Sequence, residues 1–147
     1  MARNVIEGIH IYLGETLRIQ SAERNEAYYM IFKRETDEMI GFCGIRLREG
    51  KDMPYLGNIE YEIYEPFRGQ GYAKEASLIL GNVAYDWGVQ SLTITANVKN
   101  KASINVIQSL GAKFIEVVKV PKKCCLYKQG DRLLAVYDWK IEKRNQL

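Results

Sequence analysis

The spacing of apolar residues changes abruptly at one place in the chain, and this change constrains the fold more than any other feature. Apolar and polar residues alternate over residues 58–65, which is typical of a strand with two different faces. Pro66 ends the alternation, and apolar residues then recur at helical spacing over residues 72–87. The turn between them, residues 67–71, contains two glycines. The pattern therefore predicts a strand that leads through a glycine turn into an amphipathic helix.

The same pattern continues as a strand–helix–strand unit. Gly88 ends the predicted helix, and residues 91–98 alternate again. A connection of this length is normally a right-handed crossover, so strands 58–65 and 91–98 are expected to run parallel. A shorter helix is predicted for residues 101–110.

The rest of the chain predicts antiparallel hairpins. The expected strands cover residues 5–12, 16–20, 28–34, 39–47, 113–120 and 132–141, with turns at 13–15, 35–38 and 129–131 and a loop at 48–55. Hairpins on both sides of a crossover predict a mixed, mostly antiparallel sheet flanked by helices, in the α+β or α/β class.

Length and composition favour one domain spanning residues 1–147. The 21 Lys and Arg against 18 Asp and Glu give a net charge of +3, too small an excess to predict nucleic-acid binding. No apolar run is long enough to cross a membrane, and the N-terminus lacks the apolar segment of a signal peptide. Three cysteines, two of them adjacent, do not make a disulfide framework, so a cytoplasmic location is expected. The single histidine, His10, leaves little for a zinc site, and no metal is expected.

The glycine turn is the first candidate for a functional site. Backbone N–H groups and the positive end of the helix dipole point out of a junction between a strand and a helix. Gly69 and Gly71 allow an anionic group to come close to these N–H groups, and Arg68 adds a positive charge. The turn can bind a phosphate or diphosphate, or it can be a connection that merely needs two glycines.

Two common phosphate-binding loops do not fit this turn. No Gly-x-x-x-x-Gly-Lys-Ser/Thr string occurs in the chain. A dinucleotide-binding turn needs glycine or alanine where Lys74 stands, and an acidic residue where Asn97 stands.

A third type of loop does fit. The pattern Arg-x-x-Gly-x-Ala at residues 68–73 resembles the acyl-CoA diphosphate loop of the GNAT superfamily of N-acyltransferases. Residues 61–76 (YEIYEPFRGQGYAKEA) are similar to motif A of that family. Residues 97–103 (NVKNKAS) and 110–114 (LGAKF) are similar to its motif B. The form of motif B most resembles the branch with ribosomal-protein-alanine and spermidine acetyltransferases.

The resemblance implies a fold in which strands 58–65 and 91–98 splay apart and hold acetyl-CoA, with residues 58–114 as the cofactor-binding core. The pantetheine arm would bond to backbone groups of Ile63 and Tyr64, as an added strand does. The residues expected to hold the rest of the cofactor are Arg68, Gly69, Gln70, Gly71, Tyr72 and Ala73 in the turn, and Asn97, Asn100 and Ser103 in motif B.

The implied reaction is direct attack of an amine on a thioester, which needs a base, an oxyanion donor and an acid. Glu60 and Glu62 share one face of their strand and could accept the ammonium proton, although alternating glutamates also simply face solvent. A backbone N–H near Tyr64 would bind the oxyanion. Tyr127 or Ser103 could protonate the departing thiolate.

Two departures from the family pattern affect these expectations. Ile107 stands where many relatives carry a tyrosine that acts as the acid. Residues 20–27 leave little room for the helices that usually frame the acceptor site. The acceptor pocket would then be open, or completed by a second subunit in a homodimer.

The sequence thus predicts an N-acetyltransferase that uses acetyl-CoA and acetylates a primary amine on a small molecule, a polyamine or a polypeptide. Acidic residues near the presumed cleft, Asp52, Glu60 and Glu62, favour a cationic amine. Two alternatives stay open: a catalytically silent module that binds or senses acyl-CoA, and a nucleotide-binding oxidoreductase.

Overall fold

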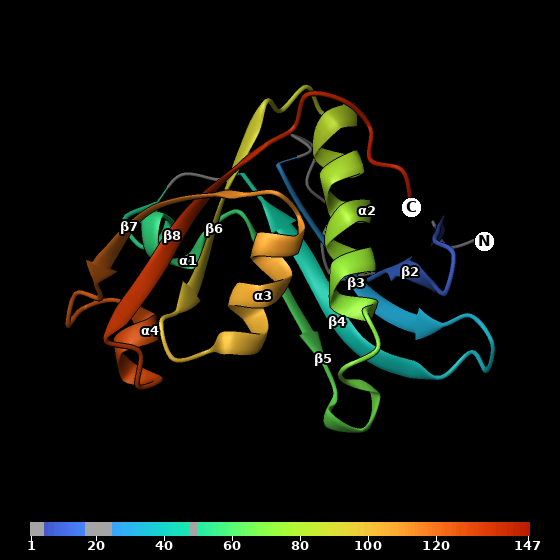
Figure 1. Cartoon of the computed structure of the whole chain (residues 1–147), viewed down its shortest axis with the longest axis horizontal. Helices are drawn as coiled ribbons and strands as arrows, with labels where there is room; N and C mark the ends of the chain where they lie inside the picture. Colours follow the sequence, from blue (N-terminus) through green and yellow to red (C-terminus); the bar gives the residue numbers. More distant parts are fainter. Residues whose placement is uncertain (1–4, 17–24, 48–49) are drawn as a thin grey trace.

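The computed structural model describes residues 5–16, 25–47 and 50–147, which form an α+β fold (Figure 1). The strands are β1 (Val5–Glu7), β2 (Ile11–Glu15), β3 (Glu26–Lys33), β4 (Met39–Arg46), β5 (Ile59–Ile63), β6 (Ser91–Asn97), β7 (Lys113–Lys119) and β8 (Leu133–Lys140). The helices are α1 (Met53–Leu56), α2 (Tyr72–Asp86), α3 (Lys101–Ser109) and α4 (Cys125–Lys128), with a 3₁₀ turn, η1 (Glu65–Phe67). No helix in these described ranges is long and apolar enough to span a bilayer.

The strands form two sheets whose neighbours are all antiparallel within the described residues. The first sheet has the order β1-β2-β3-β4-β5, and the second has the order β6-β8-β7. Strands β5 and β6 run in the same direction, and no ladder joins them (Figure 1). They touch where they begin, because the Asn58 N–H donates to the Thr93 carbonyl at 2.7 Å. The expected α+β fold with a splayed parallel pair is therefore confirmed.

Helix α2 lies over the first sheet and closes the hydrophobic core. It packs against β5, β4 and β2, and its residues Ala76, Ile79 and Leu80 are almost completely buried. The same core contains Ile45 from the first sheet and Ile94 from the second. The apolar face of α2 that the sequence predicted is therefore the face that packs in the core shared by the two sheets.

The first hairpin differs from the predicted one. The chain turns at residues 8–10 rather than 13–15, and β2 contains the residues assigned to that turn. A Cβ at Gly8 would lie 2.4 Å from a carboxylate oxygen of Glu75, so glycine fits a close approach here. The predicted strand at 16–20 and most of the short segment 20–27 fall outside the described residues.

Two short helices were not predicted. Helix α1 lies in the region assigned to the loop 48–55, and Pro54 stands in its first turn, where a missing N–H costs nothing. Helix α4 precedes the polar turn at 129–131. Each has only four residues, too few for a periodic pattern to indicate a helix.

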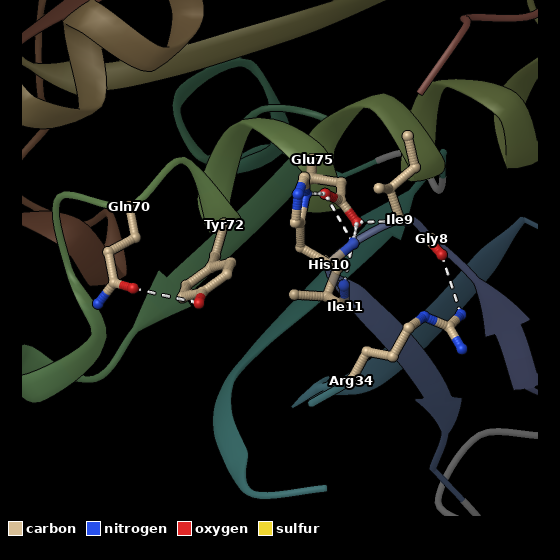
Figure 2. Close-up of polar contacts among 8 residues, drawn as sticks. All are labelled: Gly8, Ile9, His10, Ile11, Arg34, Gln70, Tyr72 and Glu75. Atoms are coloured by element: carbon tan, nitrogen blue, oxygen red, sulfur yellow. Dashed lines mark hydrogen bonds and ion pairs between the residues drawn. The ribbon is translucent and has the colours of Figure 1, made fainter. Parts of the chain in front are cut away.

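One carboxylate ties the first turn of α2 to the turn between β1 and β2 (Figure 2). Glu75 Oε2 accepts the N–H groups of Ile9 at 2.9 Å, His10 at 3.0 Å and Ile11 at 3.1 Å. Its other oxygen lies 2.9 Å from the His10 Nδ1. Arg34 donates to the Gly8 carbonyl at 2.9 Å on the other side of this turn. These bonds fix the start of α2, and with it the glycine turn that precedes the helix.

We predict that Glu75→Gln lowers the free energy of unfolding by about 1–3 kcal/mol, because an amide replaces a charged acceptor of three N–H groups. Denaturant unfolding followed by circular dichroism measures this change. Glu35→Gln is the matched control, since Glu35 is exposed in the β3–β4 turn. Equal stability of the two variants would contradict the role given to Glu75.

Candidate cofactor and active site

The glycine turn leads from β5 through η1 into α2 with its backbone N–H groups unpaired. Gly69 and Gly71 have φ values of +79° and +84°, which glycine adopts readily. No side chain caps α2, and within the described residues the N–H groups of residues 69–73 have no acceptor. A Cβ at either glycine would meet no atom within 4 Å, so open space lies beside the turn. This arrangement suits a phosphate or diphosphate group.

The side chains of the turn are less free than its backbone. Arg68 Nε donates to the Ile63 carbonyl at 2.7 Å, and its Nη2 lies 3.9 Å from Glu62. The Tyr72 hydroxyl donates to Gln70 Oε1 at 3.2 Å (Figure 2). The Arg68 guanidinium thus lies back toward the end of β5, with more than half of the side chain exposed. Its remaining N–H groups can still meet an anion at the turn.

The edge of β5 that faces β6 is open for pairing. Tyr64 donates its N–H to the Ile40 carbonyl at 2.9 Å, so this residue points its backbone toward β4. Alternation then turns the backbone groups of Tyr61 and Ile63 toward β6. The described part of the chain supplies no strand to this edge, which can accept an extended pantetheine arm.

The expected contacts on this edge need two adjustments. The Ile63 carbonyl already accepts from Arg68, and the Tyr64 N–H already donates to Ile40. The Ile63 N–H is therefore the better placed donor near Tyr64 for an oxyanion.

A partly buried tyrosine, Tyr61, joins β5 to α3. The Tyr61 hydroxyl lies 2.9 Å from Ser103 Oγ, and it donates to the Ser103 carbonyl at 3.3 Å. Burial raises the pKa of Tyr61, and the hydrogen bond to Ser103 partly offsets this rise. The phenol therefore stays protonated at neutral pH. Sequence reasoning placed Tyr61 on the apolar face of its strand, so this role was missed.

The two asparagines of motif B are engaged in local structure. Asn100 Oδ1 accepts the Ser103 N–H at 3.1 Å and caps α3. Asn97 Nδ2 donates to Asp131 at 2.6 Å, while its oxygen accepts the Lys99 N–H at 2.9 Å. Both side chains thus fix the end of β6 and the start of α3. Their expected contact with cofactor stays a prediction.

The two candidate bases have different surroundings. Glu60 lies 3.1 Å from Nη1 of Arg46, whose side chain is only 7% exposed. Glu62 is half exposed, and its nearest cation is the Arg68 nitrogen at 3.9 Å. One oxygen of Glu60 is thus committed to an ion pair with a buried guanidinium, whereas the ion pair of Glu62 with Arg68 is longer and more exposed.

Arg46 is a second residue that sequence reasoning missed. Its Nε and Nη2 donate to the carbonyls of Gly57 and Leu56, both at 3.0 Å. It therefore holds the end of α1 as well as Glu60. The available signal was an arginine at the end of an otherwise apolar strand, where a charge must find partners once it is buried.

Positions 127 and 107 are the other two places considered for the acid. Tyr127 is in α4, where the Arg132 guanidinium lies 3.5 Å from its ring centroid. No interaction among the described residues joins Tyr127 to Glu60 or Glu62. Ile107 is fully buried in the core, so position 107 supplies no acid.

Asn58 is a third residue that was missed, and it joins the two sheets. Its Oδ1 accepts the Thr93 N–H at 2.7 Å, and its Nδ2 donates to the Arg46 carbonyl at 3.0 Å. Together with the backbone bond to Thr93, these contacts close one end of the V between β5 and β6.

We expect Asn58→Ala to lower the free energy of unfolding by about 1–3 kcal/mol, because it leaves the Thr93 N–H and the Arg46 carbonyl without partners. Chemical denaturation provides the measurement. Asn105→Ala, at an exposed position in α3, is the control and should change stability little. A loss for Asn58→Ala no larger than that of the control would show that Asn58 does not hold the sheets together.

Comparison with known proteins places this geometry in a family. A model described as an acetyltransferase (GNAT) domain matches residues 3–113. The chain is 30% identical over 63 residues to YycN, an uncharacterised N-acetyltransferase of Bacillus subtilis (strain 168). That stretch is 43% of this chain and 40% of YycN, so it spans less than half of the relative.

Solved structures share the fold. The ribosomal-protein-S5-alanine acetyltransferase from Vibrio fischeri has a TM-score of 0.72 at 11% identity, over 97% of this chain and 100% of that one. RimL, a ribosomal L7/L12 alpha-N-protein acetyltransferase in complex with coenzyme A, has a TM-score of 0.63 at 23% identity, over 80% and 63% of the two chains. Similarity at these identities concerns the fold alone.

Proposed function

We propose that this chain, which belongs to the GNAT acetyltransferase family, transfers an acetyl group from acetyl-CoA to a primary amine. One observation carries the proposal: the unpaired N–H groups of residues 69–73 lie at the end of a β5 edge that no described strand covers. We propose residues 1–147 as one N-acetyltransferase domain, with residues 58–114 holding the cofactor. A RimL structure with bound coenzyme A supports this choice of cofactor.

In the proposed mechanism the chain binds acetyl-CoA, orients it, and accepts and donates protons during the transfer. Acetyl-CoA supplies an activated thioester. The N–H groups of the glycine turn hold the diphosphate, and the edge of β5 aligns the pantetheine arm. Glu62 accepts the proton of the ammonium group directly or through water. The Ile63 N–H donates to the oxyanion, and Ser103 or Tyr127 protonates the thiolate.

We propose a cationic amine as the acceptor, with a polypeptide N-terminus as the first choice. The negative charge of Glu62 at the cleft suits an ammonium group. Two neighbours of the same fold are named as acetyltransferases of ribosomal proteins, which supports a polypeptide acceptor. A hollow of about 570 Å³ lies near the closed end of the V. Its lining residues include Tyr55, Asn58, Thr93 and Glu116.

The cofactor site is tested by coenzyme A binding to Gly71→Ala. A methyl group at this position enters the open space beside the turn and strains a backbone with φ of +84°. We expect affinity to fall about tenfold or more, because a hydrogen bond to a charged group contributes about 1.5–3 kcal/mol. Isothermal calorimetry measures the binding. Pantetheine, which lacks the diphosphate, should bind weakly to both proteins.

Gly88→Ala is a closely matched control for this experiment. Gly88 has φ of +81° and open space around it, but it lies at the other end of α2. Both substitutions should cost similar stability, about 1–2 kcal/mol. Unchanged coenzyme A affinity in Gly71→Ala would remove the glycine turn from the cofactor site.

The catalytic base is tested by comparing Glu62→Gln with Glu60→Gln. We expect Glu62→Gln to reduce kcat by about 10²–10⁴-fold, the usual contribution of a general base. Glu60→Gln should mainly lower stability, by about 1 kcal/mol, because it weakens a half-exposed ion pair with Arg46. Thiol release with a panel of amines and N-terminal peptides gives the rates. Full activity of Glu62→Gln at every pH would exclude this carboxylate.

The alternative function is a silent module that binds acyl-CoA. Many relatives carry a tyrosine that acts as general acid where this chain has the buried Ile107, and its absence favours the silent module. Tight binding of acetyl-CoA without thiol release over the whole panel would select this alternative.

A further inference from the structure

Two thiols and a carboxylate from distant parts of the sequence meet beside the second sheet. The carboxylate of Asp52 and the sulfurs of Cys124 and Cys125 all lie within 4.8 Å of one another. Asp52 precedes α1, and the cysteines are at the start of α4. The cluster lies outside the glycine turn and the glutamates of β5, so acetyl transfer does not account for it.

The carboxylate of Asp52 has no other described task. Aspartate before a helix usually accepts an N–H of the first turn, yet the Asp52 side chain makes no such bond to α1. Its backbone carbonyl, not its carboxylate, accepts the N–H groups of Tyr55 and Leu56. The side chain turns to the two sulfurs instead.

The two sulfurs differ in burial. Cys124 is buried with Val120 and Leu134 in a small second core, whereas Cys125 is exposed. Ionised, the three groups would repel one another, and a cation between them would relieve that repulsion.

The sequence predicted no metal because it has one histidine, but this cluster needs none: we propose that Asp52, Cys124 and Cys125 bind one thiophilic divalent cation of the Zn²⁺ class. A tetrahedral ion with bonds of about 2.3 Å to sulfur and about 2.0 Å to oxygen holds its ligand atoms roughly 3.5–3.8 Å apart. Each pair of these atoms, now within 4.8 Å, therefore needs to close by at most about 1.3 Å. Two thiolates select a soft ion over Mg²⁺ or Ca²⁺.

Binding is written as an exchange of protons for the ion. The two thiols lose one proton each to solvent, and the two thiolates and the carboxylate each form one bond to the cation. Three protein ligands leave a fourth position for water. The ion would link α1 to α4, two single-turn helices whose residues Tyr55 and Leu126 pack against the same small core.

The test uses the full chain, reduced with a phosphine and titrated with Cd²⁺ or Zn²⁺. We expect one ion per chain, an ultraviolet thiolate-to-Cd²⁺ charge-transfer band, release of protons and a higher Tm with the ion. Cys124→Ser and Cys125→Ser should each lose this binding. Asp52→Asn should weaken it by at least about tenfold, since even outer-shell partners contribute that much to metal affinity.

Two control variants change a cysteine and an aspartate that lie outside the cluster. Cys43→Ala removes the third thiol, which is buried in the main core, and Asp37→Asn alters an exposed aspartate in the β3–β4 turn. Both should keep the band and the Tm shift, with far-ultraviolet circular dichroism checking the fold of each variant. The site is refuted if the Cys124→Ser/Cys125→Ser double variant binds the ion like the parent chain. It is equally refuted if Asp52→Asn binds as tightly, or if the reduced parent chain binds no ion and forms only a Cys124–Cys125 disulfide in air.

Discussion

The contact between Asn58 and Thr93 is the constraint on which the cleft depends. Two hydrogen bonds of 2.7 Å join the beginnings of β5 and β6, and no ladder continues beyond them. Two sheet edges that start together and then diverge keep their polar backbone groups available over the rest of their length. An unpaired strand edge normally risks pairing with another chain, and here it is a place where an extended ligand can pair.

The second requirement is a fixed position for the start of α2. Glu75 holds that first turn against the β1–β2 turn, while Arg68 reaches back to the end of β5. The glycines between these anchors adopt backbone conformations that most residues avoid. These contacts fix the turn between β5 and α2 so that its unpaired N–H groups lie beside the unpaired edge of β5.

Local periodicity predicted most of this architecture. The alternation of residues 58–65, the helix from Tyr72 and the alternation of residues 91–98 correspond to β5, α2 and β6 with small differences at their ends. The positions of α1 and α4 were not predictable, because four residues carry no period. The N-terminal hairpin was placed wrongly because the decisive partner of its turn, Glu75, is remote in sequence.

Only part of the candidate site could be predicted from the sequence. The glycine turn could be recognised, since its chemistry lies in consecutive residues. The roles of Asn58, Tyr61 and Arg46 could not, because each depends on a partner in another element. The spacing of Glu60 and Glu62 made them look equivalent, and the buried guanidinium beside Glu60 separates them.

The Glu75 contact also bears on the order in which the chain can fold. The N–H groups of residues 9–11 find their acceptor 64 to 66 residues later in the sequence. During synthesis the first hairpin leaves the ribosome long before that carboxylate exists, so its turn stays bonded to water until α2 has emerged. Closing so long a loop comes late. We therefore expect the turn between β1 and β2 to be among the last described parts of the chain to gain its native hydrogen bonds.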